Sequence, residues 1–167
     1  RFLSQTPCQP NGRGFFYARQ LTGSALARPS PGAAKMRLRV HRAQPGMIEY
    51  QITPESPEAH CFVVAVDIPE PDPGGQCLRM PAWIPGSYMI RDFARQIVTL
   101  EAGSGGAQVE VIKLDKQTWR CAPVEDALRI EYQVYARDLS VRAAYLDTTR
   151  GYFNGTSVFL SVDGREN

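Results

Sequence analysis

The sequence predicts an all-β fold, an antiparallel β-sandwich or curved-sheet domain of about eight or nine strands. Three observations carry this prediction: short stretches alternate apolar and polar residues, one stretch is almost continuously apolar, and Pro and Gly separate these stretches. The chain has 167 residues, which is enough for one domain with a substantial core. It contains no apolar run of about 18 residues, so we expect no membrane-spanning helix.

Two stretches give the clearest strand patterns. Residues 127–135 alternate strictly, so that every second side chain from Leu128 to Val134 is expected to point inward. Residues 60–68 are nearly all apolar and rich in Val, which predicts a central strand covered on both faces. Further strands are expected at 36–43, 47–53, 76–80, 97–102, 109–114, 117–121 and 157–162.

The helix candidate is the segment 90–100, in which Ile90, Phe93, Ile97 and Leu100 recur at steps of three and four residues. The three residues Ile97, Val98 and Thr99 are β-branched and favour a strand. A short helical turn followed by a strand is therefore the alternative.

Residues 1–35 are expected to form a disordered head outside the folded domain of residues 36–167. The head carries five basic residues and no acidic one, which leaves 14 basic and 17 acidic residues and a net charge of −3 for the domain. It is either sequence upstream of a natural start at Met36 or an organelle transit segment. We expect a cytoplasmic protein with reduced thiols, because a secretory signal and C-x-x-C pairs are both absent from the sequence.

Catalytic motifs are absent from the sequence. Its two histidines, His41 and His60, stand far apart, and neither belongs to an H-E-x-x-H zinc motif. Basic and acidic residues are interleaved, which does not fit a nucleic-acid-binding stripe. We therefore predict no catalytic residue, metal ligand or cofactor in this chain, and neither a nucleic acid nor a membrane as partner.

Two loops carry more functional groups than a connection needs. The first, 81–95, places a Pro85-Gly86 pair suited to a type II turn among aromatic and charged residues: Trp83, Tyr88, Arg91, Asp92 and Arg95. These side chains either line a binding cleft or plug the end of the sandwich, with Arg91 and Asp92 tying the loop down.

The second loop, 147–157, presents Tyr152 and Asn154 between two glycines, with a tight-turn signal at Asn154-Gly155. The ring, hydroxyl and amide of these residues would orient a polar ligand group. The alternative is a plain hairpin with Phe153 packed inward.

Four segments stand in the order 81–95 (PAWIPGSYMIRDFAR), 114–119 (LDKQTW), 135–142 (YARDLSVR) and 151–157 (GYFNGTS). In this order they resemble the N-terminal domain of the glycyl aminopeptidases, zinc metallopeptidases of peptidase family M-sixty-one. The resemblance runs from about Met36 to Gly164. It implies a β-rich domain followed by a mostly helical catalytic domain, which carries H-E-x-x-H and a further Glu as zinc ligands, and often a PDZ-like module.

By this resemblance the chain is expected to be the non-catalytic N-terminal domain of a zinc-dependent aminopeptidase. It would pack on its own catalytic domain and help to bound the cleft for a peptide substrate, with zinc in the intact enzyme only. The substrate-cleft candidates are Tyr152, Asn154 and Gly155, and the loop or inter-domain contact candidates are Trp83, Tyr88, Arg91 and Asp92. The alternative function is a stand-alone β-sandwich module that binds a peptide or a sugar.

Overall fold

The structure, a computed structural model of the chain, describes residues 38–39, 46–87 and 89–165. The predicted head of residues 1–35 and most of the expected strand 36–43 lie outside the described residues, as does Tyr88. Within the described part, no helix is long and apolar enough to cross a membrane.

Three antiparallel sheets make up the described fold, which confirms the predicted all-β class. The largest has the order β1-β2-β3-β9-β5-β6, with β1 Leu38–Arg39, β2 Glu49–Ser56, β3 Cys61–Ile68, β9 Leu128–Tyr135, β5 Ile97–Ser104 and β6 Ala107–Val109. The second has the order β12-β4-β8-β7, with β12 Ser161–Val162, β4 Cys77–Arg79, β8 Thr118–Cys121 and β7 Val111–Lys113. A small hairpin joins β10 Ala144–Leu146 to β11 Gly151–Phe153.

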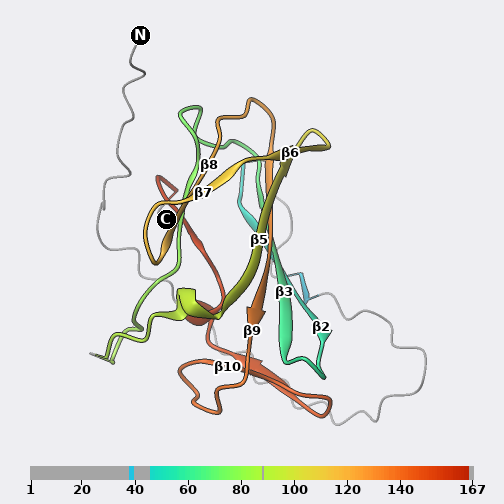
Figure 1. The fold of residues 1–167 in the computed structure, drawn as a ribbon, viewed down its shortest axis with the longest axis vertical. Coiled ribbons are helices and arrows are strands. Elements are labelled where there is room, and N and C mark those ends of the chain that lie inside the picture. The colour runs from blue at the N-terminus through green and yellow to red at the C-terminus, as the bar shows by residue number, and fades with distance from the viewer. Residues whose placement is uncertain (1–37, 40–45, 88, 166–167) are drawn as a thin grey trace, which may run out of the picture.

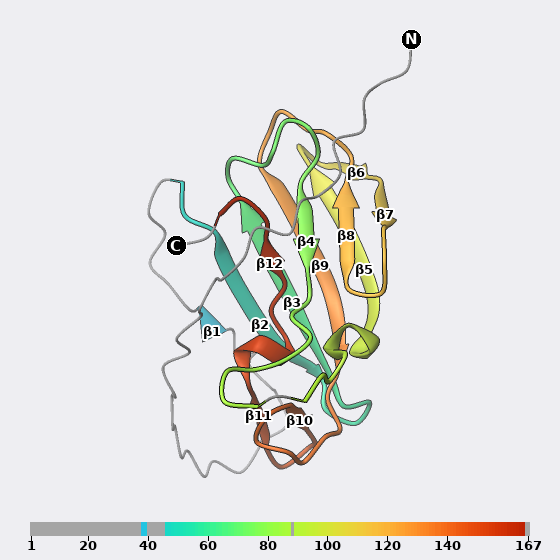
Figure 2. The same cartoon turned by 90° about the vertical axis from the view of Figure 1, so that its left-hand side faces the viewer.

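The two larger sheets form two layers with the core between them. Figure 1 shows β2, β3, β9 and β5 side by side, and Figure 2 shows β12, β4, β8 and β7 in front of them, with the β10–β11 hairpin at one end. The buried core takes side chains from both layers, such as Val66 and Ile130 from one and Leu78 and Trp119 from the other. Burial of these apolar side chains is the main favourable contribution to the folded state.

Strand β9 shows the predicted alternation throughout, with Leu128, Ile130, Tyr132 and Val134 buried and their neighbours exposed. Its partner β3 occupies the predicted central position of the large sheet, between β2 and β9. The second face of β3 is only partly covered, because Cys61, Val63 and Asp67 on that face are half-buried. The expectation of a strand covered on both faces is therefore met in part.

The alternative that we described for the helix candidate is confirmed. A 3-10 turn, η1 Phe93–Gln96, leads directly into β5. The prediction of one strand over 157–162 is wrong for its first half, because Asn154 caps a second 3-10 turn, η2 Gly155–Ser157, and only Ser161–Val162 is a strand. The structure describes twelve strands, more than the eight or nine expected, because several are only two or three residues long.

The expected reduced thiols are found at two of the cysteines. Cys61 and Cys121 are free, whereas Cys77 is disulfide-bonded, which contradicts the expectation there. Burial raises the pKa of Cys121 to about 11, so its thiol stays protonated and inert.

Two tyrosines of the large sheet hold the C-terminal segment against it. The Tyr132 hydroxyl donates to Val158 O (2.8 Å) and accepts from Leu160 N (3.0 Å), and the Tyr50 hydroxyl donates to Leu160 O (2.8 Å). Burial raises the pKa of Tyr50 to about 12 and also raises the pKa of Tyr132. Both hydroxyls therefore remain protonated and able to donate.

We expect Tyr132→Phe to lower the free energy of unfolding by about 2–4 kcal/mol, because it leaves the buried Val158 carbonyl and Leu160 amide without their partner. The matched control, Tyr50→Phe, removes one hydrogen bond and should cost about 1 kcal/mol. Urea unfolding of the 167-residue chain measures both values. Equal losses in the two variants would contradict the anchoring role of Tyr132.

Gly75→Ala should destabilise the chain strongly. Gly75 has φ 103°, and a Cβ there would lie 2.6 Å from the backbone oxygen of Cys121, so the strand β8 or the loop must shift. Gly106 has a similar φ of 85° with no atom within 4 Å of a Cβ, so Gly106→Ala should cost only the backbone strain of about 1–2 kcal/mol. Thermal unfolding should therefore show a clearly lower Tm for Gly75→Ala than for Gly106→Ala.

Candidate functional site

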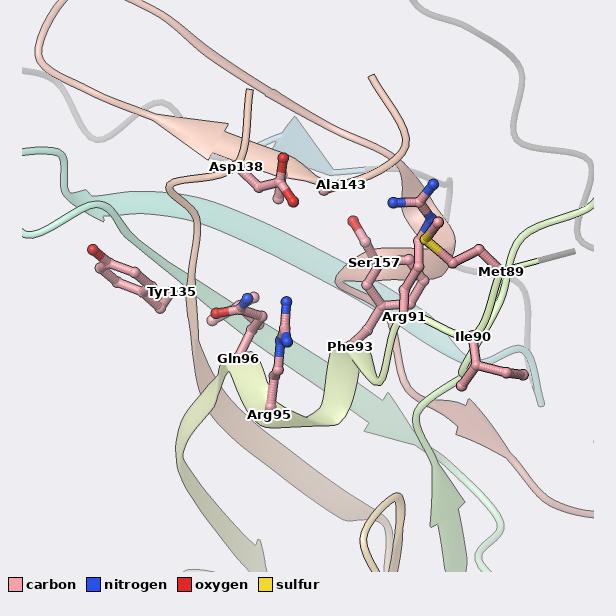
Figure 3. A pocket seen from close by; sticks show the side chains of 12 residues that line it. Met89, Ile90, Arg91, Phe93, Arg95, Gln96, Tyr135, Asp138, Ala143 and Ser157 are labelled. Carbon is pink, nitrogen blue, oxygen red and sulfur yellow. The ribbon is translucent and has the colours of Figure 1, made fainter. Parts of the chain in front are cut away.

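A cavity of about 220 Å³ opens between the first of the two loops and the end of β9, with Ser157 of the second loop at its edge. One wall consists of residues 89–91 and the turn η1, and the other of the end of β9, the segment that follows it and Ser157 of η2 (Figure 3). The floor is apolar, with Phe93, Val134 and Ala144 buried. Arg91, Arg95 and Asp138 supply the charged groups.

The first wall is shaped by a short loop that closes on itself. Arg91 N donates to Ala82 O (2.7 Å) at its base, and Ser87 N donates to Ile84 O (3.1 Å) across the Pro85-Gly86 pair. Gly86 has φ 79°, which confirms the predicted type II turn. The loop therefore fixes the backbone of Arg91 at the rim of the cavity.

Several side chains of this loop are exposed, which does not fit side chains that close the end of the sandwich. Trp83 is 51% exposed, Met89 61% and Ile90 62%, whereas Ile84 is buried. Among the described residues of the loop from Ala82 to Arg91, Ile84 is the one buried in the core, and the interpretation of the aromatic side chains as a plug is wrong for Trp83. Trp83 does not line the cavity.

Asp92 sets the direction of the chain as it enters η1. It occupies the left-handed region, with φ 46° and ψ 53°, and its backbone oxygen accepts a hydrogen bond from Arg95 N (3.0 Å). Its carboxylate forms an exposed ion pair with Lys116 (2.9 Å). An exposed pair of this kind contributes about 0–1 kcal/mol, so the backbone geometry of Asp92 matters more than its charge.

Arg91 and Arg95 project into the cavity from the same wall (Figure 3). Neither guanidinium group forms an ion pair or hydrogen bond with another described residue. Moreover, Nε of Arg91 is buried without a hydrogen-bond partner. Because a buried unpaired donor is costly, the guanidinium group of Arg91 is under-satisfied, and an acceptor that reached its accessible nitrogens would be stabilising.

The opposite wall carries Asp138 and Ser157. The Asp138 carboxylate accepts a hydrogen bond from Ser140 N (2.8 Å) and so shapes the segment after β9. Ser157 is buried, and its hydroxyl donates to Asn154 O (2.7 Å). Both side chains have partners on their own wall, unlike the two arginines.

Asn154 has a structural task next to the cavity. Its side-chain oxygen accepts from Thr156 N (3.1 Å), which caps η2, and its backbone N donates to Ala143 O (2.9 Å). The tight turn expected at Asn154-Gly155 is therefore not formed. The turn of the β10–β11 hairpin lies at residues 147–150 instead.

Tyr152 lies on β11 and stacks on Tyr145, with ring centroids 5.7 Å apart and planes at 21°. Its neighbour Phe153 is half-buried against Phe62 and Phe159, as the plain-hairpin alternative expected. Tyr152, Asn154 and Gly155 do not line the cavity.

Asp147 holds the turn of this hairpin. Its carboxylate accepts hydrogen bonds from the Thr149 hydroxyl and amide, from Arg150 N and from the Tyr145 hydroxyl. These bonds, above all those from Thr149, hold the pKa of Asp147 well below its usual range.

Among the described residues, no group of three or more His, Cys, Asp and Glu is arranged to hold a metal ion. His60 has a structural contact. Its Nδ1 lies 2.5 Å from Leu146 O, and this hydrogen bond connects the turn before β3 to β10. The zinc that the resemblance implies therefore has no fitting ligand set in the described part.

The structure thus brings together only part of the predicted site. Arg91 lines the cavity with Ser157 of the second loop, whereas Trp83, Asp92 and Tyr152 lie outside its lining. Arg95 was named among the charged side chains of the first loop, whereas Asp138 was not singled out as a site candidate. The signal for Asp138 was its place in the segment 135–142, one of the four that carry the resemblance.

Comparisons with known proteins give a consistent result. The family described as Peptidase M61 N-terminal domain matches residues 49–167. A solved structure, the crystal structure of an aminopeptidase N family protein from Idiomarina loihiensis, is similar with 46% sequence identity and a TM-score of 0.69. The similarity covers 71% of this chain but only 20% of that protein's chain. No curated protein matches.

The family match begins at the start of β2 and includes every described strand except β1, together with the cavity and the two loops. It covers well over half of the chain and agrees with the likeness to a solved aminopeptidase. The chain therefore belongs to the family of peptidase M61 N-terminal domains.

Proposed function

We propose that this chain is the non-catalytic N-terminal domain of a cytoplasmic, zinc-dependent aminopeptidase of the glycyl aminopeptidase type. In this proposal it packs on the catalytic domain and helps to bound the substrate cleft. The zinc ligands and the general base belong to another part of the polypeptide, so no catalytic step is assigned to residues of this chain.

The family match is the observation that carries the proposal. The similar aminopeptidase N family protein supports it, because this chain corresponds to a fifth of that protein's length. A domain of that relative size leaves most of such a polypeptide for a separate catalytic part.

Exposed apolar side chains near the cavity support a packing role. Met89 and Ile90 are more than 60% exposed, and so are Leu139 (65%) and Val141 (81%) in the segment after β9. Large apolar side chains gathered in this way are typical of surfaces that another protein or domain covers. The cavity end of the domain is thus the favoured contact surface.

The proposed contribution to the cleft comes from Tyr152 and Asn154. The Tyr152 hydroxyl has no hydrogen bond to another described residue, while its ring is held by stacking on Tyr145. A tyrosine ring held in place, with a hydroxyl free to donate or accept a hydrogen bond, could contact the N-terminal region of a peptide substrate. Gly155 follows directly and keeps the approach to Asn154 free of a side chain.

The first experiment identifies the polypeptide that contains this chain. The coding sequence after Asn167 should specify an H-E-x-x-H motif within a few hundred residues, and the extended protein should bind zinc and cleave glycyl substrates. The 167-residue chain with added zinc should show no activity. Peptide or sugar binding by the chain alone, without such an extension, would favour the stand-alone module.

In the extended protein, Tyr152→Phe should lower kcat/KM for glycyl substrates about tenfold, because it removes one hydrogen bond to the substrate and keeps the stacked ring. Tyr145→Phe is the matched control, since its hydroxyl bonds to Asp147 instead and its loss should leave kcat/KM nearly unchanged. Steady-state kinetics with zinc content measured in parallel checks both variants.

Asn154→Asp separates the two tasks of that residue. It keeps the side-chain oxygen that caps η2 and replaces the amide nitrogen, so stability should be nearly retained. A selective fall in kcat/KM would support substrate contact by the amide. Unchanged kinetics in Asn154→Asp and Tyr152→Phe together would refute the cleft assignment.

A further inference from the structure

We infer that the cavity between η1 and the segment after β9 is a docking site for a carboxylate side chain. The occupant is an acidic residue flanked by apolar ones, on a segment of the catalytic domain. This inference rests on the proposed function. It adds which surface of the domain contacts the catalytic domain and which kind of side chain binds there.

The charges of the cavity point to an anion. Arg91 and Arg95 both project into it, and only Asp138 lies opposite (Figure 3). The Asp138 carboxylate already accepts a hydrogen bond from Ser140 N, whereas neither arginine has a partner among the described residues. Two unpaired guanidinium groups facing one carboxylate leave an excess of positive charge in the cavity.

The guanidinium group of Arg91 lacks hydrogen-bond acceptors within the described residues. Its Nε carries one hydrogen, is shielded from solvent and has no acceptor among the described residues. Because Nε is shielded, a docking carboxylate would meet the two terminal nitrogens of Arg91, which are not among the buried unbonded atoms, and take two parallel hydrogen bonds from them. Arg79 differs, because its guanidinium has an ion-pair partner in Asp163 at 3.4 Å even though its Nε is unbonded.

The surroundings select an acidic residue within an apolar segment over a small free anion. Met89 and Ile90 form an exposed apolar rim on one side of the cavity, and Tyr135 lies on the other. An inorganic anion would leave this rim in water, whereas a peptide segment buries it while its carboxylate reaches the arginines. A size of about 220 Å³ suits one or two side chains.

The position of Arg91 is fixed before any partner binds. The hydrogen bond from its backbone N to Ala82 O closes the loop, and the left-handed Asp92 directs the chain into η1, which carries Arg95. Because the backbone at both arginines is already set, docking would order their side chains without the further cost of ordering the loop.

The first test uses the 167-residue chain and two peptides, acetyl-Leu-Glu-Leu-amide and acetyl-Leu-Gln-Leu-amide. In NMR titrations the glutamyl peptide should shift the Nε–H signals of Arg91 and Arg95 and bind about tenfold more tightly than the glutaminyl peptide. Arg91→Gln should abolish this preference. Arg129→Gln, which breaks an exposed ion pair with Asp67 elsewhere, should leave it unchanged.

The second test places the site in the larger protein. Backbone amides of residues 89–96 and 134–144 should exchange hydrogen at least about tenfold more slowly in the extended protein than in the 167-residue chain. Arg91→Gln in the extended protein should return them toward the rates of the chain alone.

Three results would overturn the inference. Equal binding of the two peptides, or no shift at Arg91 Nε, would exclude a carboxylate site. An active, zinc-containing extended protein with unprotected amides at the cavity would show that the catalytic domain docks elsewhere and would leave the proposed function intact. An extended protein without peptidase activity would refute the proposed function, while the peptide titration would still decide the chemistry of the cavity.

Discussion

The hydroxyl of Tyr132 joins the two halves of the fold. It projects from the central strand β9 and forms hydrogen bonds with both Val158 O and Leu160 N. One side chain thus provides partners for two backbone groups of residues 158–160, which are not part of a β-strand. This attachment fixes residues 158–160 across the large sheet and delivers β12 to the edge of the second sheet. It also holds the C-terminal end of η2, from which Ser157 faces the cavity.

An irregularity in the sheet creates the space for the site. The register between β5 and β9 shifts at Val98, where an extra residue bends the start of β5. The bend lets η1 lie over the end of β9 at Val134, so Arg95 faces the segment that follows β9. In a regular ladder, β5 would continue alongside β9, and the two walls of the cavity would not face each other.

The sequence was informative where the signal is local. Strict alternation predicted β9 residue by residue. Pro85-Gly86 predicted its turn because the proline ring fixes φ and glycine, which has no Cβ, adopts the positive φ that the turn requires. The strand predicted from residue 157 failed because the Asn154 side chain competes for the backbone and caps a 3-10 turn.

The site itself was only partly predictable, because it depends on contacts between distant segments. Arg91 and Asp138 come together through the pairing of β5 with β9 and the entry of η1, which no local pattern specifies. Tyr152 and Asn154 looked alike as polar residues of one glycine-bounded loop. The structure separates them, since one stacks on a neighbouring ring and the other caps a turn.

The closure of the first loop by a single backbone hydrogen bond between Arg91 and Ala82 has a consequence for how this family can diverge. Residues 83–87 form a protruding tip whose conformation is set by its own turn, with Ile84 as its buried anchor. The tip can therefore be lengthened or exchanged beyond Ile84 without moving the arginine at its base. Related domains could therefore differ in the length and sequence of this tip while the backbone at Arg91 keeps its place.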